Sequence, residues 1–274
     1  MKSEKNTSAR GKLLRWAGSK SQSESFIAPY LDFEKLYIEP FCGSASFFFS
    51  QRPTSALLND NNRNLIDFYK QLRASPQALW TIYDNLSPEK ESYYRIRSEF
   101  NKQQSSIKKA AYFLYLNHYC FNGIYRTNRK GDFNTPFGQH SESKSKLDWD
   151  RFNFFASISQ KATFNCLDFE DFLDQSNPVD SCIYIDPPYF TNDSRVFNEY
   201  GSALFCKNDL KRLKSVVEKL SKENLIVLTY KDCTEFRDLF GDLIVDKIVV
   251  TRNVGGFSGR RKRDSELVAV ASPQ

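Results

Sequence analysis

Short apolar runs alternate with amphipathic stretches along most of the chain, and this alternation is typical of an α/β protein. The last two of seven such runs are joined without room for a helix, so we expect them to pair antiparallel. The seven runs that predict strands lie at the start of 36–49 and at 55–60, 162–169, 182–188, 224–230, 243–250 and 266–272.

Residues 62–150 contain no strand pattern and instead predict a group of helices. One helix is expected from Asn62 to Arg73. Two segments open on Ser-Pro, which is a capping residue followed by proline at the first helical position. The remaining helices are expected over 75–86, 87–102 and 105–120, and one more, beginning at Asn208, over 208–223.

This pattern predicts two domains with different secondary structure. Residues 1–61 and 151–274 together supply the strands of one sheet domain, and 62–150 form a helical domain inserted between those strands. A length of 274 residues agrees with about one to two domains. Hydrophobic residues make up 40% and aromatic residues 15% of the chain, which excludes a disordered protein.

No apolar run approaches the roughly 18 residues of a membrane helix, and the first residues lack the apolar core of a secretory signal. We therefore expect a soluble, intracellular protein that does not contact a membrane. The six cysteines lie far apart without a Cys-x-x-Cys pair, and there are only two histidines. Buried thiols and chemistry without a metal are expected.

The segment LYIEPFCGSASFFF at 36–49 predicts a strand, a tight turn at Gly43 and the start of a helix. The following apolar run ends at Asp60, roughly 20 residues after the turn. This is the layout of a Rossmann-like nucleotide-binding unit, in which Asp60 would hold ribose hydroxyls. A full Gly-x-Gly-x-x-Gly is absent, so a glycine that only ends a strand is the alternative.

The sharpest local signal is Asp186-Pro187-Pro188-Tyr189, which follows the apolar strand CIYI. Open α/β sheets bind ligands at the carboxyl ends of their strands. The two prolines stiffen the backbone and remove two amide donors, so that carbonyl oxygens and a carboxylate remain as acceptors for an amino group. Tyr189 supplies a flat face for a heterocycle. The alternative is a proline-rich turn that merely ends a strand.

Four stretches together resemble the Dam-like DNA adenine-N6 methyltransferases. They are LLRWAGSKSQ (13–22), YIEPFCGSASFFF (37–49), FLYLNHYCFNGIYRTNRKGDFNTPFG (113–138) and YIDPPY (184–189), joined near the end by GGFSGRRKRDSELVAV. The resemblance implies a Rossmann-like, seven-stranded methyltransferase sheet with an inserted helical target-recognition domain. It also implies transfer of a methyl group from S-adenosylmethionine to N6 of a flipped-out adenine in double-stranded DNA.

The resemblance places ten residues around S-adenosylmethionine. Trp16 and Lys20 belong to a segment that closes over this cofactor, and residues 39–43 cradle its methionine part. Asp60 contacts its ribose, and Asp168 with its neighbour contacts its adenine. The ten positions are Trp16, Lys20, Glu39, Pro40, Phe41, Gly43, Asp60, Asp168, Phe169 and Asp186. At the point of transfer, Asp186 and the Pro187 carbonyl would accept hydrogen bonds from the target amino group, on which Tyr189 would stack.

A second set of residues would contact DNA. Phe121 matches an aromatic residue that enters the duplex, and Arg126 is the best candidate for a bidentate contact with guanine. Residues 252–263 hold five basic residues and no acidic one, which favours a contact with the DNA backbone. A solvated basic loop is the alternative for both loops. The other predicted DNA contacts are Arg15, Asn122, Ile124, Asn128, Arg129, Lys130, Pro136, Arg260, Arg261, Lys262 and Arg263.

The net charge of +6 gathers in the N-terminal arm and in these two loops, which agrees with a polyanionic partner. GATC is the expected target, although Arg15, Phe121 and His140 depart from the family pattern. The competing hypotheses are methylation of cytosine N4, RNA adenine or a protein glutamine, and a DNA-binding module without catalysis. The resemblance is also compatible with a cognate restriction endonuclease as a partner. The expected cellular location is the bacterial nucleoid or, for a protein encoded by a phage, the host cytoplasm.

Overall fold

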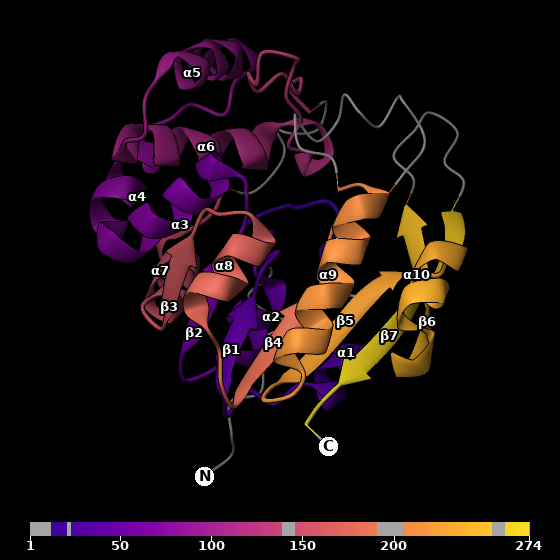
Figure 1. Ribbon diagram of the computed structural model, residues 1–274. Helices are drawn as coiled ribbons and strands as arrows, with labels where there is room; N and C mark the ends of the chain where they lie inside the picture. Colours follow the sequence, from indigo (N-terminus) through magenta and orange to yellow (C-terminus); the bar gives the residue numbers. More distant parts are fainter. Residues whose placement is uncertain (1–11, 21–22, 139–145, 191–204, 254–260, 274) are drawn as a thin grey trace.

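The computed structural model describes residues 12–20, 23–138, 146–190, 205–253 and 261–273, and for 250–253 and 261–264 it describes the backbone alone. A mixed sheet with the strand order β3-β2-β1-β4-β5-β7-β6 runs through the molecule (Figure 1). Its strands are β1 (Leu36–Glu39), β2 (Ala56–Asn59), β3 (Ala162–Asn165), β4 (Ser181–Ile185), β5 (Leu225–Lys231), β6 (Ile244–Asn253) and β7 (Arg261–Ala271).

The seven predicted strands are confirmed, and so is the antiparallel pairing of the last two. Strands β1 to β5 pair in parallel, whereas β7 pairs antiparallel with both β5 and β6. Strand β7 begins at Arg261, earlier than the apolar run at 266–272 predicts, because its polar first half pairs with β6 from Val249 to Asn253.

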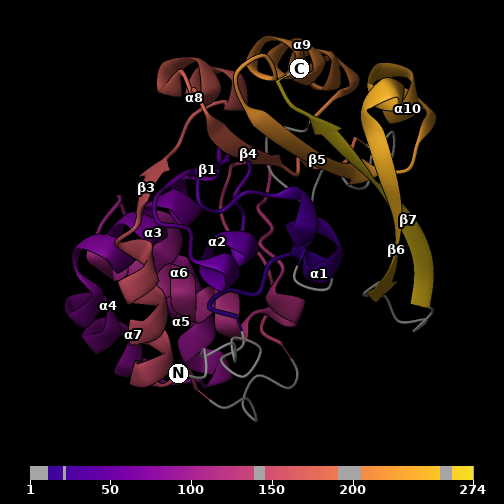
Figure 2. The same cartoon turned by 90° about the horizontal axis from the view of Figure 1, so that it is seen from below.

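Three helices cover one face of the sheet, and the remaining helices lie on the other face (Figure 2). The first group is α8 (Phe169–Ser176), α9 (Lys207–Leu220) and α10 (Thr234–Phe240), followed by the short turn η6 (Gly241–Leu243). The second group is α1 (Glu24–Ile27), η3 (Ala28–Tyr30), α2 (Ser46–Gln51), α3 (Arg63–Ala74), α4 (Pro76–Asp84), α5 (Lys90–Lys102), α6 (Ile107–Tyr119), η4 (Phe121–Gly123) and α7 (Trp149–Ser159).

The caps of the predicted helices decide where each one begins. Asn62 accepts a hydrogen bond from the Leu65 amide and caps α3, and Pro76 stands in the first turn of α4, as predicted. The prediction that α5 begins at Ser87-Pro88 is wrong. Glu89 is its N-cap instead, and the Ser87 carbonyl accepts a hydrogen bond from the Tyr115 hydroxyl at 2.6 Å.

The start predicted for α9 at Asn208 is also wrong. This helix begins at Lys207 with Cys206 as its N-cap, because the Asp209 carboxylate accepts a hydrogen bond from the Cys206 amide at 2.8 Å. None of the six cysteines forms a disulfide. The expected burial holds for three of them, whereas two are half-buried and Cys206 is exposed where α9 begins.

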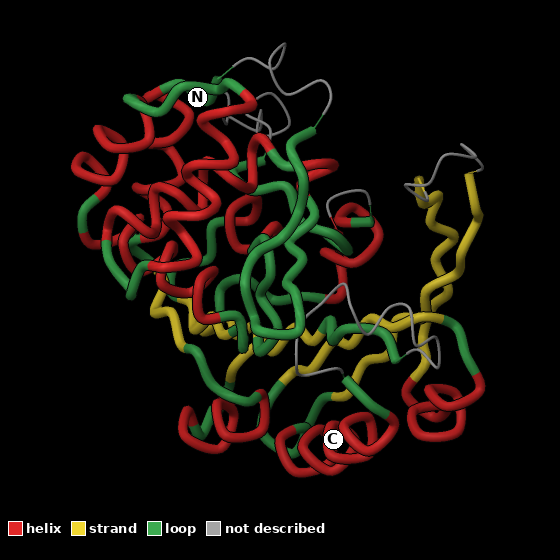
Figure 3. The backbone as a smooth tube through the Cα atoms, turned by 90° about the horizontal axis from the view of Figure 1, so that it is seen from above, coloured by secondary structure: helices red, strands yellow, loops and turns green. Residues whose placement is uncertain are grey.

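The helical segment shares its hydrophobic core with the sheet. Tyr69 of α3 stacks on Phe164 of β3, with ring centroids 5.0 Å apart, and Phe49 of α2 meets Phe155 of α7 edge to face. One continuous cluster of buried residues extends from these contacts to the centre of the helices. A second cluster lies between the sheet and α8, α9 and α10. In the view from above, the helical group therefore lies directly against one end of the sheet (Figure 3).

Asn59 joins the carboxyl ends of three neighbouring strands. Its amide nitrogen donates to the carbonyls of Pro40, after β1, and Leu167, after β3, at 3.0 and 3.1 Å. Its amide oxygen accepts from the Leu167 backbone N–H at 3.0 Å. The side chain is 1% exposed, so water cannot replace these three bonds.

We predict that Asn59→Ala lowers the free energy of unfolding by about 2–4 kcal/mol, because three buried backbone groups lose their partner. Urea unfolding at neutral pH measures this change. Asn85→Ala is the matched control: Asn85 is exposed, its side chain makes one bond to the Thr81 carbonyl, and its loss should change stability by about 0.5 kcal/mol or less. Equal losses for the two variants would contradict the role of Asn59.

Candidate active site

A cavity of about 780 Å³ opens at the carboxyl ends of the parallel strands, where an open α/β sheet places its ligand. The structure brings together there all of the residues predicted to hold a cofactor or to carry out transfer. These cavity-lining residues are Trp16, Lys20, Glu39, Pro40, Phe41, Gly43, Asp60, Asp168, Phe169, Asp186, Pro187 and Tyr189.

At one end of the cavity, Lys20 joins Asp186, Tyr189 and Glu266. Its ammonium nitrogen lies 2.9 Å from Asp186 Oδ1, 3.2 Å from Glu266 Oε1 and 2.9 Å from the Tyr189 hydroxyl. The Tyr189 hydroxyl in turn donates to Glu266 Oε1 at 2.7 Å. Lys20 and Glu266 are almost fully buried. The segment before α1 is thus bound to residues that follow β4 and lie on β7.

Burial and charge act in opposite directions on this network. Burial raises the pKa of Asp186, and the Lys20 ammonium opposes that rise. Burial alone would lower the pKa of Lys20, but Asp186, Tyr189 and Glu266 outweigh it and raise that pKa. Thr229 on β5 donates a further hydrogen bond to Asp186 Oδ1 at 3.1 Å. Lys20 therefore keeps its charge and holds an acidic side chain in an apolar site.

Glu39 at the end of β1 is a buried acid of a different kind. Its Oε1 accepts a hydrogen bond from the Tyr37 hydroxyl at 2.5 Å, and only 3% of the residue is exposed. Burial raises its pKa to about 8, with a further contribution from the charge of Asp186. A pKa of about 8 means that Glu39 is mostly protonated at neutral pH.

The predicted strand–turn–helix around Gly43 is confirmed. Gly43 has φ +46°, and a Cβ there would lie 3.0 Å from Cδ1 and Nε1 of Trp16. Its backbone N–H donates to Asp60 Oδ2 at 3.0 Å, and the Asn62 N–H donates to Oδ1 at 2.9 Å. Glycine is needed at this position because the indole of Trp16 packs against the turn. The same indole stacks on Tyr125.

Aromatic rings form the other end of the cavity. Phe41 lies 5.3 Å from Phe169 and 5.9 Å from Phe205, measured between ring centroids. Asp168 caps α8 by accepting a hydrogen bond from the Glu170 backbone N–H at 3.0 Å. The predicted adenine contacts Asp168 and Phe169 therefore stand beside each other on one helix terminus.

The residues predicted to enter and read DNA lie on the segment after α6. Phe121 is 39% exposed on η4, and Asn122 beside it has φ +53°. Pro136 is exposed, and its carbonyl accepts a hydrogen bond from the Phe121 N–H at 2.9 Å. Ile124 is half-buried below them. This hydrogen bond holds Phe121 and Pro136, which lie at opposite ends of the segment, next to each other at the surface.

Arg126 is held by a neighbour that the sequence did not single out. Its Nε donates to the Asn134 side-chain oxygen at 2.8 Å, and its Nη2 lies 3.5 Å from the Asn134 carbonyl. Arg97 of α5 also donates to that carbonyl, at 3.2 Å. Asn134 therefore orients the guanidinium of Arg126 through its Nε–Nη2 edge, which leaves Nη1 and the second hydrogen of Nη2 for a further contact.

Asn128 folds the basic loop on itself. Its side-chain oxygen accepts hydrogen bonds from the backbone N–H groups of Lys130 and Asp132, at 2.9 and 3.0 Å. Arg129 and Lys130 are exposed on the resulting turn. The structure gives the Asn128 side chain a turn-forming role, and its predicted contact with phosphate stays a prediction.

Arg15 connects this segment to the cavity. The side chain of Asn117 on α6 accepts from the Arg15 N–H at 2.8 Å and donates to the Arg15 carbonyl at 2.7 Å. Gly123, with φ +69°, faces the Arg15 side chain, whose Cβ would lie 2.3 Å from a Cβ at that position. Arg15 directly precedes Trp16, which lines the cavity. Consecutive residues therefore contact the predicted DNA-reading segment and the predicted cofactor site.

The C-terminal basic loop is only partly described. Arg260 and His140 lie outside the described residues. The first three residues of β7 pair with the last three of β6, and only their backbone is described. They are Arg261, Lys262 and Arg263. Their predicted contact with the DNA backbone stays a prediction.

Sequence reasoning missed several polar residues in or next to the cavity. Thr229 stands inside an apolar strand, Glu266 stands where the apolar half of β7 begins, and Asn59 precedes Asp60 at the end of another strand. A polar residue within an apolar run was the available signal, because a buried polar group needs a specific partner. Arg212 of α9, which pairs with Asp168, gave no such signal, since it lies among other charged residues of an amphipathic helix.

Comparison with known proteins identifies the family. A model of the D12 class of N6 adenine-specific DNA methyltransferases matches residues 16–254. A DNA adenine methylase of Vibrio cholerae serotype O1 is 32% identical over 269 residues, which cover 95% of each chain. The chain belongs to the D12 class of N6 adenine-specific DNA methyltransferases.

Two further relatives extend the range of sources. The Retron Ec67 DNA adenine methylase of Escherichia coli is 31% identical, and the matched region covers 94% of this chain and 90% of the relative. The Type II methyltransferase M.MjaIII of Methanocaldococcus jannaschii is 30% identical and covers 91% of this chain and 94% of its own.

Membership in this class decides between the hypotheses left open by the sequence. The protein is a DNA methyltransferase that acts on adenine N6, not on cytosine N4, RNA or protein. It requires a methyl donor, and DNA is its substrate. No helix in the described ranges is both long and apolar enough to cross a membrane.

The raised pKa of Glu39 predicts a pH-dependent stability in this methyltransferase. The unfolded glutamate ionises near its ordinary value of 4.5, whereas the folded one keeps its proton up to about 8. Between these values the unfolded chain binds fewer protons, so the contribution of Glu39 to stability falls as pH rises. Relative to wild type, Glu39→Gln should gain up to about 5 kcal/mol of unfolding free energy between pH 4 and pH 9.

Urea unfolding of wild type and Glu39→Gln at both pH values, at one salt concentration, measures this difference. Glu218→Gln is the control, because Glu218 is an exposed acid on α9 whose removal should shift stability little at either pH. A difference between Glu39→Gln and wild type that does not change with pH would contradict a buried, protonated Glu39.

Proposed function

We propose that S-adenosylmethionine is the methyl donor and that it occupies the cavity at the carboxyl ends of β1, β2 and β4. The cavity volume of about 780 Å³ suits a ligand of this size. S-adenosylmethionine carries a sulfonium and an ammonium, and the cavity is lined by acidic and aromatic side chains that attract cations. The acids are Glu39, Asp60, Asp168, Asp186, Asp209 and Glu235, and Trp16, Phe41, Phe169 and Phe205 are among the aromatic residues.

Residues 39–43 and Trp16 hold the methionine part in this proposal, because they line the same stretch of the cavity and Gly43 lets the turn pack directly against the indole. Asp60 contacts the ribose. Both of its oxygens already accept backbone hydrogen bonds, so its orientation is fixed before binding. Asp168 and Phe169 contact the adenine. Lys20 lines the same cavity, and in this proposal its contacts with Asp186 and Glu266 also make it orient the acceptor of the target base.

Methyl transfer to adenine depends on Asp186 and Pro187. When bound, S-adenosylmethionine supplies an electrophilic methyl group on its sulfonium sulfur. Asp186 Oδ2 and the Pro187 carbonyl accept hydrogen bonds from the N6 amino group and turn its lone pair toward that methyl carbon. As the nitrogen–carbon bond forms, the carbon–sulfur bond breaks and its electron pair stays on sulfur. The amino nitrogen then releases one proton, through Asp186, to solvent.

One observation carries this assignment. Within the described residues, the contacts of Asp186 with Lys20 and Thr229 both fall on Oδ1, so the carboxylate is fixed through one oxygen while Oδ2 remains for the substrate. Fixed acceptors of this kind supply catalysis by orientation, without a covalent intermediate or a metal.

The target adenine must leave the duplex to reach Asp186, which costs a few kcal/mol. Stacking on an aromatic side chain contributes about 1–3 kcal/mol per base and offsets much of that cost. Tyr189 suits this role, because its hydroxyl is held by Lys20 and Glu266 and its ring meets Tyr230 edge to face at 5.2 Å. The ring plane is therefore fixed before the base arrives.

We expect Asp186→Ala to lower kcat by about 10²–10⁴, since it removes the main acceptor for the amino group. The fold should persist, because Lys20 keeps its second partner, Glu266. Transfer of a labelled methyl group to a duplex oligonucleotide, analysed as nucleosides, measures the change.

DNA binding of Asp186→Ala, followed by fluorescence anisotropy, should stay within about twofold of wild type. Asp242→Ala, at an exposed carboxylate distant from the cavity lining, is the control and should keep full turnover. Turnover of Asp186→Ala near that of wild type would exclude the proposed mechanism.

We further propose that GATC is the target and that Arg126 reads one of its guanines. Asn134 fixes one edge of the guanidinium, which favours a bidentate contact through the terminal nitrogens. Phe121 enters the duplex where the adenine has left it. Arg15, Asn122, Ile124 and Pro136 line the same surface, whereas Asn128, Arg129, Lys130, Arg260, Arg261, Lys262 and Arg263 contact phosphates.

Arg126→Ala should lower the preference for the cognate site over a site with one changed base pair by about 10–100-fold, because a bidentate guanine contact contributes roughly 1–3 kcal/mol. The ratio of kcat/KM on the two duplexes measures this preference. Arg129→Ala is the control: Arg129 is exposed on the turn, so its loss should weaken both duplexes alike and reduce the salt dependence of binding. The same ratio in both variants would contradict the division between reading and phosphate contact.

The remaining assignments are proposals on the same basis. Residues 62–150 act as the target-recognition domain, and 1–61 with 151–274 as the catalytic domain. The enzyme works where cellular DNA lies, in the cytoplasm. A cognate restriction endonuclease is a partner that the name of the relative M.MjaIII, a Type II methyltransferase, suggests.

A further inference from the structure

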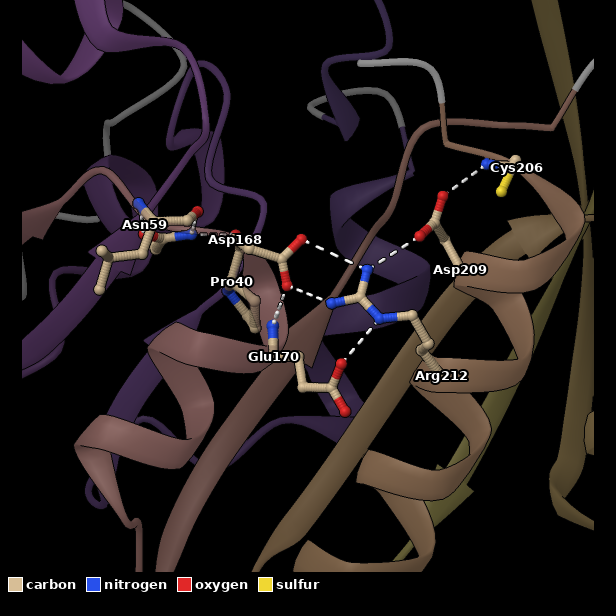
Figure 4. Close-up of polar contacts among 8 residues, drawn as sticks. Pro40, Asn59, Asp168, Glu170, Cys206, Asp209 and Arg212 are labelled. Atoms are coloured by element: carbon tan, nitrogen blue, oxygen red, sulfur yellow. Dashed lines mark hydrogen bonds and ion pairs between the residues drawn. The ribbon is translucent and has the colours of Figure 1, made fainter.

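A single guanidinium gathers three carboxylates at the aromatic end of the cavity (Figure 4). Arg212 Nη2 lies 2.5 Å from Asp168 Oδ1, and Nη1 lies 3.4 Å from Asp168 Oδ2. Arg212 Nε lies 2.7 Å from Glu170 Oε2, and Nη1 lies 2.9 Å from Asp209 Oδ1. Two of these acids belong to the first residues of α8 and its cap, and the third lies one turn before Arg212 on α9.

This cluster contains the polar residue that we assign to the donor's adenine. Asp168 Oδ1 accepts from both Arg212 and the Glu170 N–H, whereas among the described residues Oδ2 has only the long contact with Nη1. One oxygen is therefore fixed, and the other keeps capacity to accept a hydrogen bond from a ligand amino group. The fork of an arginine suits this task, since it holds a carboxylate in a defined plane.

The same guanidinium also orders the aromatic wall. Asp209 bridges Arg212 to the Cys206 backbone N–H, and thereby fixes the chain directly after Phe205 (Figure 4). Phe205 lies over Phe41 and Phe169, with ring centroids 5.9 and 6.2 Å away. The Arg212 guanidinium itself lies 4.7 Å from the centre of the Phe169 ring.

Stability does not account for the cluster. Arg212 is 32% exposed and its three partners are 21–41% exposed, and ion pairs at such positions contribute little to folding. Without Arg212, three carboxylates would repel one another beside the cavity and turn toward water. The guanidinium therefore determines the direction of Asp168 more than it determines whether the two helices pack.

We infer that Arg212 is a positioning residue for the methyl donor: it orients Asp168 and, through Asp209 and Cys206, the ring of Phe205 around the donor's adenine. The inference rests on the proposed donor. It predicts that Arg212 affects the affinity for the donor and leaves both the transfer step and DNA binding unchanged.

A second ion pair between the same helices provides a matched control. Lys219 of α9 lies 2.8 Å from Asp174 of α8, both are more than half exposed, and neither lines the cavity. Arg212→Met and Lys219→Met each remove one cation between α8 and α9, so they alter the net charge alike. They differ because only Arg212 contacts Asp168, the two other acids of the cluster and the Phe169 ring.

Calorimetric titration with S-adenosylmethionine and with S-adenosylhomocysteine measures the affinity of each variant. Arg212→Met should raise both Kd values about tenfold or more, since a charge-assisted hydrogen bond contributes that much. Its KM for the donor should rise in parallel, with kcat at saturating donor and the Kd for DNA within about twofold of wild type. Lys219→Met should bind both ligands as wild type does.

Arg212→Lys keeps the charge without the fork, and it should recover part of the affinity lost in Arg212→Met. This variant also keeps the inference testable if Arg212→Met does not fold. Unchanged ligand affinity in Arg212→Met, or an equal loss in Lys219→Met, would overturn the inference while the proposed donor stands. Absence of S-adenosylmethionine binding by the wild type would reject the donor itself and the inference with it.

Discussion

The active site depends on one buried ammonium that two carboxylates share. Lys20 lies between Asp186, which follows β4, and Glu266 of β7, in a place where either acid alone would be costly to ionise. Because Lys20 belongs to the segment before α1, this segment brings to Asp186 the charge that opposes the effect of burial on the pKa of that carboxyl. The cavity is thus closed on one side by the same interaction that prepares its acceptor. A compact, strongly basic ammonium suits this buried position, whereas the planar fork of Arg212 suits a half-exposed cluster of three acids.

The segment that carries Lys20 is also bound to the helices. Asn117 of α6 forms two hydrogen bonds with the backbone of Arg15, and His118 contacts the Leu13 carbonyl at 2.8 Å. Gly123 leaves space for the Arg15 side chain at the start of the predicted DNA-reading segment. Residues 13–20 therefore contact the sheet at one end and the helices at the other. With the shared hydrophobic core, this explains why a chain that inserts its helices between strands still forms one site.

The sequence predicted the sheet well because strands buried on both faces are continuous apolar runs, and all seven were found. The twelve residues that the sequence assigned to the cofactor and to methyl transfer all line the cavity. They could be found because they belong to contiguous motifs. Interactions between distant segments escaped it. Glu266 lies 246 residues from Lys20, and Arg212 lies 44 residues from Asp168. Helix starts failed where a tertiary contact overrode the local signal, as at Ser87, whose carbonyl is bound by Tyr115.

The charge of the cavity has a consequence for turnover with the proposed donor. Glu39, Asp60, Asp168 and Asp186 line the cavity, and Lys20 is the cation that faces Asp186. A cationic donor is attracted to such a site, and its sulfonium favours ionisation of Glu39, whose pKa of about 8 lies within easy reach of neutral pH. In this proposal, methyl transfer removes the sulfonium charge, so the product would be attracted less strongly than the donor to a cavity lined by acidic side chains.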